Sequence, residues 1–176
     1  MNPDPFPPFS SQQVELVDEA ATLALGVEIA RMLEPGVCVH LRGDLGAGKT
    51  TLCRGILRGL GFAGRVKSPT YTLVELYVIS KLNLYHFDFY RFNDPEEWND
   101  AGFRDLFNTT NVCLVEWPER AGDLLPPPDL LIQLAPTPGM GRLALIQAHT
   151  SRGQRLLQMR QRLPVLPALP PPASNA

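Results

Sequence analysis

A phosphate-binding motif is the most informative feature of the chain. Residues 43–50 read GDLGAGKT, which fits the pattern GxxxxGK[ST]. A short apolar run precedes the motif and an amphipathic segment begins inside it, in the order strand, loop, helix. Glycines let successive backbone N–H groups turn toward phosphate oxygens, and the start of a helix adds unpaired donors and a positive dipole end. The motif predicts a site for a nucleoside triphosphate.

The residues of this loop have separate expected roles. Lys49 reaches the β- and γ-phosphates, the Thr50 hydroxyl binds Mg²⁺, and Thr51 contacts the α-phosphate. The other residues expected to bind nucleotide wrap the phosphates: Asp44, Leu45, Gly46, Ala47 and Gly48. The cofactors expected here are ATP and Mg²⁺, and Lys49 is the first candidate catalytic residue.

Two carboxylates are candidates to complete the arrangement of Mg²⁺ and attacking water. Glu116 ends the apolar run NVCLVE, a Walker-B-like pattern with Glu in place of Asp. Asp88 lies in HFDFYR, where strand alternation puts His86, Asp88 and Tyr90 on one face. That face fits a site and equally fits an exposed strand surface. A metal held by the His-x-Asp pair is not favoured, because no third ligand lies nearby in the sequence.

A candidate switch segment follows the motif. Ser68-Pro69-Thr70 lies where phosphate-loop proteins often carry a nucleotide-sensing segment, although Pro69 also favours a simple turn into a strand. Trp117 follows Glu116 directly, and the Pro118 after it indicates that the strand ends there. This tryptophan is either a core residue or a lid or partner contact at the catalytic edge.

The elements that must position these residues alternate between strands and helices, which predicts an α/β fold. Asp18 caps the first expected helix, and Gly55 and Gly59 lie inside the second, where each costs about 1 kcal/mol relative to alanine. Close packing of the second helix on a sheet is the expected compensation. The expected helices span 19–33, 49–60, one or two short pieces of 94–107, and 151–162; the expected strands span 14–17, 37–41, 71–78, 82–90, 112–116, 130–134 and 143–147.

Length and composition limit the classes of protein. With 176 residues, 44% apolar and 19% charged, the chain suits one domain with a sizeable core. A net charge of −2 excludes a globally basic nucleic-acid coat, and no DNA partner is expected. Three cysteines without a CxxC pair indicate neither a disulfide framework nor a zinc site. No signal peptide or apolar run of about 18 residues is present, so a soluble, cytoplasmic protein without a membrane partner is expected.

Proline and arginine are unevenly distributed. Prolines crowd both ends, which predicts a disordered segment 1–11, a folded domain 12–163 and a disordered tail 164–176. From Arg142 onward there are five arginines and no acid. These arginines indicate either a solvated helix face or a contact with RNA, phosphate or an acidic partner.

Four classes of phosphate-loop protein are considered. A GTPase needs an [NT]KxD motif, which is absent, and a transporter ATPase needs a far longer chain. The third class is a small-molecule or nucleotide kinase, with the C-terminal arginines as a phosphate-clamping lid. The fourth class is an ATPase whose hydrolysis serves a partner complex.

A family resemblance in five stretches favours the ATPase that serves a partner complex. GDLGAGKTTLCRG, VKSPTYTLVE, HFDFYR, GFRDLF and LVEWPER occur in this order, span about residues 18–128 and extend more weakly to Arg142. In these motifs the chain resembles the TsaE (YjeE) family, the ATPase component of bacterial tRNA threonylcarbamoyladenosine synthesis. The resemblance implies a phosphate-loop fold with a mixed parallel and antiparallel sheet flanked by helices. It also implies ATP hydrolysis coupled to TsaB and to TsaD, which modifies the adenosine beside the anticodon, so that tRNA is reached through the complex.

The resemblance also assigns residues. Lys49 and Thr50 match the family's phosphate and Mg²⁺ roles, Glu116 matches its Mg²⁺-associated acid and Asp88 its second essential acid. Trp117 matches the family's functional tryptophan, and Ser68, Pro69 and Thr70 match its switch-like segment. Residues Glu19 to Thr22 match the helix start that the family places near the adenine. The chain departs from the family at 97–100 and at Leu106, which concerns local packing and not the chemistry. Slow turnover alone is expected, because no arginine finger is evident beside the loop.

Overall fold

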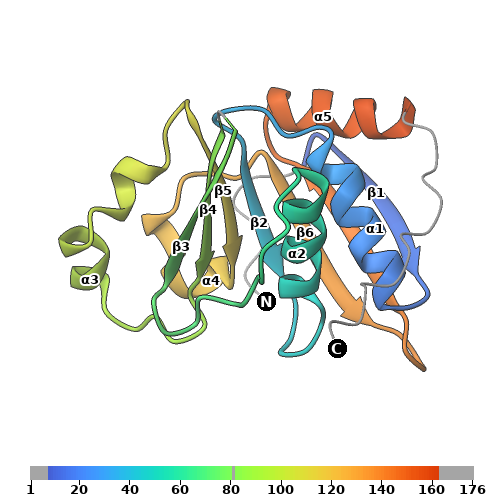
Figure 1. Ribbon diagram of the computed structural model, residues 1–176, viewed down its shortest axis with the longest axis horizontal. Coiled ribbons are helices and arrows are strands. Elements are labelled where there is room, and N and C mark those ends of the chain that lie inside the picture. Colours follow the sequence, from blue (N-terminus) through green and yellow to red (C-terminus); the bar gives the residue numbers. More distant parts are fainter. Residues whose placement is uncertain (1–7, 81, 163–176) are drawn as a thin grey trace.

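The fold is a seven-stranded mixed sheet with helices on both faces (Figure 1). The structure is a computed structural model and describes residues 8–80 and 82–162. The strand order is β1-β7-β6-β2-β5-β4-β3, with β6, β2, β5 and β4 parallel and the other three antiparallel to their neighbours. The strands are β1 (Ser10–Leu16), β2 (Cys38–Arg42), β3 (Val74–Ile79), β4 (Leu82–Asp88), β5 (Asn111–Glu116), β6 (Leu130–Pro136) and β7 (Arg142–Ala148). The expected α/β class and mixed sheet are confirmed.

Helices cover the sheet with two separate cores. Their bounds are α1 (Glu19–Ala30), α2 (Lys49–Gly59), α3 (Pro95–Asp100), α4 (Pro118–Ala121) and α5 (Ser151–Arg162), with 3-10 turns η1 (Phe103–Leu106) and η2 (Gly122–Leu124). The core under α1 and α2 contains Ile29, Leu52 and Leu114. The core on the other face is aromatic and contains Phe87 and Trp98. Since β2 and β5 lie between these cores, both are short apolar runs.

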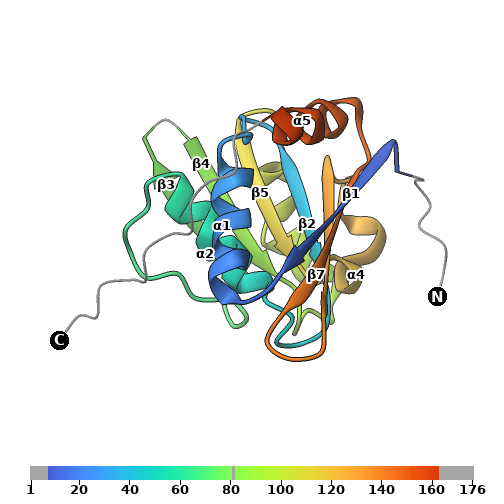
Figure 2. The same cartoon turned by 90° about the vertical axis from the view of Figure 1, so that its right-hand side faces the viewer.

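The helices α1 and α2 lie side by side on one face of the sheet (Figures 1 and 2). A Cβ on Gly55 would lie 2.4 Å from the Leu23 carbonyl oxygen, and one on Gly59 would lie 2.6 Å from the Ala30 Cβ. The interior glycines therefore permit close approach of the two helices. The expectation that they serve packing on the sheet is wrong, because they face α1.

The segment that departs from the family pattern is accommodated by aromatic packing. Trp98 on α3 is fully buried, and its ring lies 5.8 Å from that of Phe89 and 5.6 Å from that of Phe103. Its indole therefore fills the second core. Leu106, the other departure, is half-buried and packs at the edge of the same core.

Several element boundaries differ from expectation. β1 begins at Ser10, inside the segment 1–11 that was expected to be disordered, because it pairs with β7 as an edge strand whose outer face tolerates polar residues. β3 begins at Val74 instead of residue 71, since the chain turns at Leu73 with a φ of 63°. The short elements α4 and η2 were not expected. The remainder of the two proline-rich ends, 1–7 and 163–176, lies outside the described residues.

The C-terminal arginines are largely used within the chain. On α5, Arg152 donates to the Gly36 carbonyl oxygen at 2.6 Å, and Arg160 lies 3.0 Å from Glu28. Arg155 lies 3.7 Å from Glu34. These pairs hold α5 across the end of the sheet where β2 begins, opposite the phosphate loop (Figures 1 and 2). The helix therefore presents arginines that pair with groups of the chain itself and remain partly solvated, Arg155 being 64% exposed, which favours the first of the two alternatives that the sequence left open.

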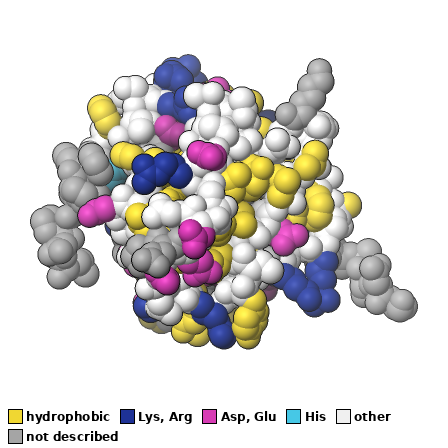
Figure 3. Space-filling model, turned by 90° about the vertical axis from the view of Figure 1, so that its left-hand side faces the viewer, with side chains coloured by type: hydrophobic (Ala, Val, Ile, Leu, Met, Phe, Trp, Pro, Cys, Tyr) yellow, Lys and Arg dark blue, Asp and Glu magenta, His cyan; other side chains and the backbone are white. Residues whose placement is uncertain are grey.

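The surface carries charges of both signs. Viewed from the left-hand side of Figure 1, acidic and basic groups alternate with hydrophobic side chains, without an extended basic area (Figure 3). Within residues 8–80 and 82–162, no helix has the length and apolar character needed to cross a bilayer.

Candidate nucleotide-binding site

The phosphate loop joins the end of β2 to the start of α2. Its backbone has a positive φ at three glycines: 141° at Gly43, 81° at Gly46 and 103° at Gly48. A Cβ on Gly43 would also lie 2.4 Å from the Leu134 carbonyl oxygen. Helix α2 begins at Lys49, so its unpaired N–H groups face the loop. The local structure is the anion-binding arrangement that the motif predicts.

A cavity of about 250 Å³ opens beside this loop. It brings together most of the predicted site residues from four separate stretches of chain. The lining residues are Leu45, Gly46, Gly48, Lys49, Thr50, Thr51, Ser68, Thr70, Asp88, Tyr90, Glu116 and Trp117. The predicted residues Asp44, Ala47 and Pro69 are sequence neighbours of the lining residues but do not line the cavity themselves.

Lys49 is folded back over its own loop. Its Nζ donates to the carbonyl oxygens of Gly43 at 2.5 Å and Asp44 at 2.9 Å, and lies 4.0 Å from the centre of the Trp117 ring. Burial lowers the pKa of Lys49, and the nearby carboxylates of Glu116 and others oppose that shift. The ammonium group is thus held at the floor of the cavity, close to where the loop would hold phosphates.

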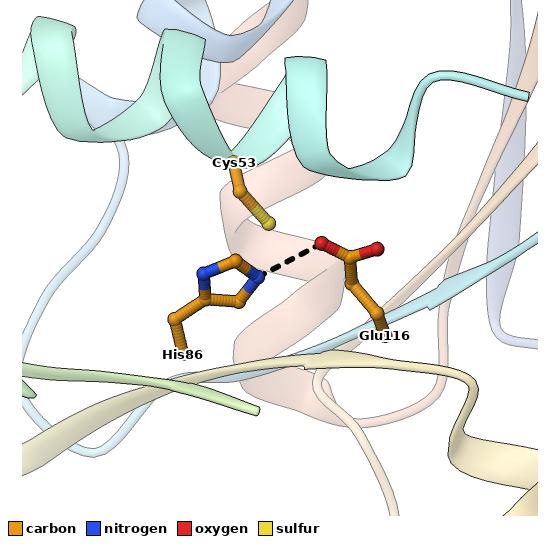
Figure 4. Close-up of side chains that lie close together, drawn as sticks. All are labelled: Cys53, His86 and Glu116. Atoms are coloured by element: carbon orange, nitrogen blue, oxygen red, sulfur yellow. Dashed lines mark hydrogen bonds and ion pairs between the residues drawn. The ribbon is translucent and has the colours of Figure 1, made fainter. Parts of the chain in front are cut away.

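Glu116 is bound to the first turn of α2. The Thr50 hydroxyl lies 2.9 Å from Oε1 and 3.1 Å from Oε2 of this carboxylate. On the other side, His86 Nε2 lies 2.9 Å from Oε1, and Cys53 completes a buried cluster (Figure 4). Glu116 raises the pKa of the Cys53 thiol, after the larger effect of burial. The sequence pattern gave no reason to connect Cys53 or His86 with Glu116.

Asp88 is bound to the candidate switch segment. β4 and β5 pair so that Asp88 and Glu116 are direct neighbours. Asp88 Oδ2 accepts hydrogen bonds from the hydroxyls of Ser68 and, at 2.8 Å, Thr70, and Oδ1 accepts from the Tyr90 N–H at 2.9 Å. The face that carries His86 and Asp88 is therefore directed at the site, which decides between the two alternatives that the strand pattern left open.

Trp117 has a left-handed backbone. Its φ is 57° and its ψ is 47°, a conformation that is costly for a bulky residue. The half-buried ring lies against Lys49 on one side and 5.0 Å from the Tyr90 ring on the other. Trp117 is thus a wall of the cavity.

The start of α1 lies behind the loop and does not line the cavity. Glu19 is exposed and forms an ion pair with Arg54 at 3.5 Å. Thr22 is fully buried; its hydroxyl donates to the Asp18 carbonyl oxygen and accepts from Arg142. The guanidinium of Arg142 would also meet a Cβ on Gly48 at 3.0 Å. Arg142 thus joins α1, β7 and the loop, a role that no local sequence signal indicates.

The oxygen groups fit a magnesium ion. Mg²⁺ prefers oxygen ligands and is usually held by one or two carboxylates together with phosphates and water. The Thr50 hydroxyl and the Glu116 carboxylate meet at the cavity wall, and Asp88 lies next to Glu116. These three residues would hold the ion.

Comparisons with known proteins agree with this geometry. A family model described as threonylcarbamoyl adenosine biosynthesis protein TsaE matches residues 16–143. The tRNA threonylcarbamoyladenosine biosynthesis protein TsaE of Haemophilus influenzae is 46% identical over 145 residues, covering 80% of this chain and 91% of its own length. The protein of the same name from Bacillus subtilis is 42% identical over 110 residues, covering 62% and 68%.

A solved structure shows the same fold. The crystal structure of Bacillus subtilis YdiB superposes with a TM-score of 0.73 at 31% identity, covering 87% of this chain and 95% of that one. The matched family region contains the phosphate loop, the switch segment and both acids. The chain therefore belongs to the TsaE family of tRNA threonylcarbamoyladenosine biosynthesis proteins.

Proposed function

We propose that this protein binds ATP with Mg²⁺ and hydrolyses it slowly as the ATPase component of tRNA threonylcarbamoyladenosine synthesis, together with TsaB-like and TsaD-like proteins. One observation carries the proposal: a single cavity joins the phosphate loop, an acid bonded to its threonine, and a second acid bonded to the switch segment. A nucleotide-binding role is what the family implies.

The phosphate loop and Lys49 bind the triphosphate. Backbone N–H groups of the loop and of the first turn of α2 surround the phosphate oxygens. Lys49 lies at the cavity floor and exchanges its carbonyl partners for the β- and γ-phosphates. Trp117 keeps the ammonium group in place and limits access of water from its side.

Glu116 and Asp88 have different roles in this proposal. Thr50, Glu116 and Asp88 would hold Mg²⁺, which would supply positive charge opposite the charge that develops on the phosphates. The hydrogen bonds between the Thr50 hydroxyl and the Glu116 carboxylate orient the two groups that would bind the metal. Asp88 lies beside Glu116 and holds Ser68 and Thr70, so a change at the γ-phosphate position reaches the switch segment through one carboxylate.

The switch segment also faces the outer surface. Ser68 and Pro69 line a second groove of about 500 Å³, together with residues of the edge strand β3. A movement of this segment on hydrolysis would therefore change a surface accessible to TsaB-like or TsaD-like proteins. tRNA would be reached only through that complex.

Slow turnover without partners follows from the charges in the cavity. Lys49 is the one lysine or arginine among the described residues that line it. Phosphoryl transfer is strongly accelerated by a second cation at the γ-phosphate. Of the C-terminal arginines that a kinase lid would require, those on α5 lie at the opposite end of the sheet, and Arg142 on β7 is bonded to Asp18 and Thr22 behind the loop. The structure therefore gives the kinase alternative no support.

The test is ATP turnover by the purified protein, alone and then with its TsaB and TsaD counterparts, following ADP and free phosphate without a small phosphoacceptor. The expected result is slow release of phosphate that increases with the partners and is lost in Lys49→Ala. Arg58→Ala, an exposed position on the same helix, is the matched control. Turnover that requires a metabolite and phosphorylates it would contradict the proposal.

A further inference from the structure

His86 is buried beneath the first turns of α2. In the parallel pair of β4 and β5, His86 is opposite Leu114 and Asp88 is opposite Glu116. Alternation places the imidazole and the Glu116 carboxylate on the same face of the sheet, one pleat apart. Neither side chain is more than 3% exposed, and His86 Nε2 lies 2.9 Å from Glu116 Oε1 (Figure 4).

The Glu116 carboxylate is enclosed by donors on two sides. Thr50 contacts both carboxylate oxygens from α2, and His86 contacts Oε1 from β4. The ligand atoms of Cys53, His86 and Glu116 all lie within 4.8 Å of one another. A rotation of the carboxylate would break the His86 contact and leave a buried polar group without a partner, which is costly. The cluster therefore restricts the orientation of Glu116.

The other buried histidines behave differently. The Nε2 atom of His40 and both ring nitrogens of His149 have no hydrogen-bond partner within the described residues. In His86 only Nδ1 lacks a partner there, and Nε2 is directed at the acid of the nucleotide site. The contact with Glu116 alone therefore determines which nitrogen must carry a proton.

We propose that His86 is a positioning residue, which donates its Nε2–H to Glu116 Oε1 and holds the carboxylate in the orientation that serves Mg²⁺ and the attacking water. This role rests on the proposed function, since it matters only if the cavity binds MgATP. Residues that hydrogen-bond a metal-binding side chain change metal affinity or activity about 10- to 100-fold when they are replaced. His86 is not among the residues that line the cavity, so it would act through Glu116.

The first test compares two substitutions of the donor. His86→Leu removes the N–H, whereas the side-chain amide of His86→Gln extends to the same acceptor. We expect His86→Leu to lower kcat about 10- to 100-fold with little change in KM for ATP and a higher Mg²⁺ concentration for half-maximal turnover. His86→Gln should restore most of the activity. His149→Leu, another buried histidine replaced by leucine, should retain wild-type turnover.

Two kinetic outcomes would overturn the proposal. One is wild-type kcat and Mg²⁺ dependence in His86→Leu. The other is an equal loss in the Leu and Gln variants, because a folding defect would then explain both. If wild-type protein itself neither binds nor hydrolyses ATP, the proposed function fails, whatever the variants do.

A spectroscopic measurement tests the hydrogen bond without activity. Long-range ¹H–¹⁵N correlation spectra of the wild-type imidazoles report which ring nitrogen carries the proton. We expect a protonated Nε2 in His86 whose proton resonance moves in Glu116→Gln. An Nε2 without a proton would overturn the positioning role even if every kinetic result agreed.

Discussion

Asp88 and Glu116 occupy equivalent places on neighbouring strands, yet their hydrogen bonds lead to different parts of the site. Glu116 is bonded to Thr50 of the phosphate loop, whereas Asp88 is bonded to the hydroxyls of Ser68 and Thr70. The difference arises because α2 lies over the end of β5 and the switch segment lies over the end of β4. We therefore propose that Glu116 acts chiefly at the metal and that Asp88 connects the metal site to the switch segment.

Removing the charge of Glu116 should separate binding from hydrolysis. Glu116→Gln keeps the size of the side chain and an oxygen for His86, so nucleotide affinity should change only a few-fold. Turnover should fall about 10²- to 10³-fold, a loss typical of a group that stabilises the transition state. Binding is measured with a fluorescent ATP analogue and turnover with partners present. Normal turnover of this variant in the complex would show that another acid serves the metal.

At the scale of elements, the segment between α2 and β3 reaches the site through one carboxylate. The Ser68 and Thr70 hydroxyls donate to Asp88, while Val66 and Leu73 anchor the two sides of this short stretch in the cores of the domain. The Leu73 N–H donates to the Pro69 carbonyl oxygen at 2.7 Å, and the Asp88 N–H donates to the Leu73 carbonyl oxygen at 3.0 Å. A shift confined to residues 68–70, between these anchors, changes the bonds to Asp88 without disturbing the sheet.

Weakening the Asp88 carboxylate should loosen this segment. Asp88→Asn removes the charge that strengthens both hydroxyl contacts. We expect faster trypsin cleavage after Arg65 and Lys67, which are both exposed, with a free energy of unfolding within about 1 kcal/mol of wild type. Cleavage sites are identified by mass spectrometry, with the exposed Asp105→Asn as control. Unchanged cleavage would mean that Asp88 does not hold the switch.

The contact between α1 and α2 gives a second prediction at this scale. Alanine normally stabilises a helix interior by about 1 kcal/mol relative to glycine. In Gly55→Ala the new methyl group would meet the Leu23 carbonyl oxygen, so the net effect should be a loss of about 1–3 kcal/mol. Urea denaturation measures it, and Arg58→Ala on the exposed side should stay within about 0.5 kcal/mol. A stabilised Gly55→Ala would refute close packing of the helices.

At the scale of the whole molecule, the candidate site lies at one end of the sheet and α5 covers the other. The end after β2 and β5 carries the phosphate loop, both acids and the switch segment. The end before β2 is covered by α5. Arg152 of this helix bonds to the Gly36 carbonyl oxygen and pairs with Glu34, and Arg160 pairs with Glu28 on α1. The candidate site residues are thus concentrated at the carboxyl ends of parallel strands, where ligands usually bind in open α/β sheets.

The stability of the whole molecule should decrease in mild acid because of His40. Burial, and to a lesser degree Arg42 and His149, lower the pKa of His40 from 6.5 to about 3. The unfolded chain therefore takes up a proton below pH 6.5 that the folded chain refuses until about pH 3, so stability falls as the pH decreases through this range. At pH 5 the effect on the free energy of unfolding is about 2 kcal/mol.

His40→Gln cannot take up this proton and is the matched variant. Its free energy of unfolding should decrease by about 2 kcal/mol less than that of wild type between pH 7 and pH 5. Urea denaturation at both pH values measures the difference, and other acids cancel in the comparison. An identical decrease in both proteins would show that His40 is protonated in the folded state.

The sequence by itself determined the phosphate loop, the strand and helix around it, the α/β class, and the two candidate acids. Each of these depends on residues that lie close together in the chain, where apolar periodicity and glycine spacing are informative. The family resemblance then identified the switch segment and Trp117 as parts of one site.

Only the tertiary structure decided which groups meet. The contact of His86 with Glu116, the bond from Thr70 to Asp88, and the position of Arg142 behind Gly48 all depend on strand order and register. The same holds for the arginines of α5, which the sequence left open as ligand contacts and the fold pairs with its own acids. Such contacts join residues far apart in the chain, and no local pattern encodes them, because register is set by packing of the whole sheet.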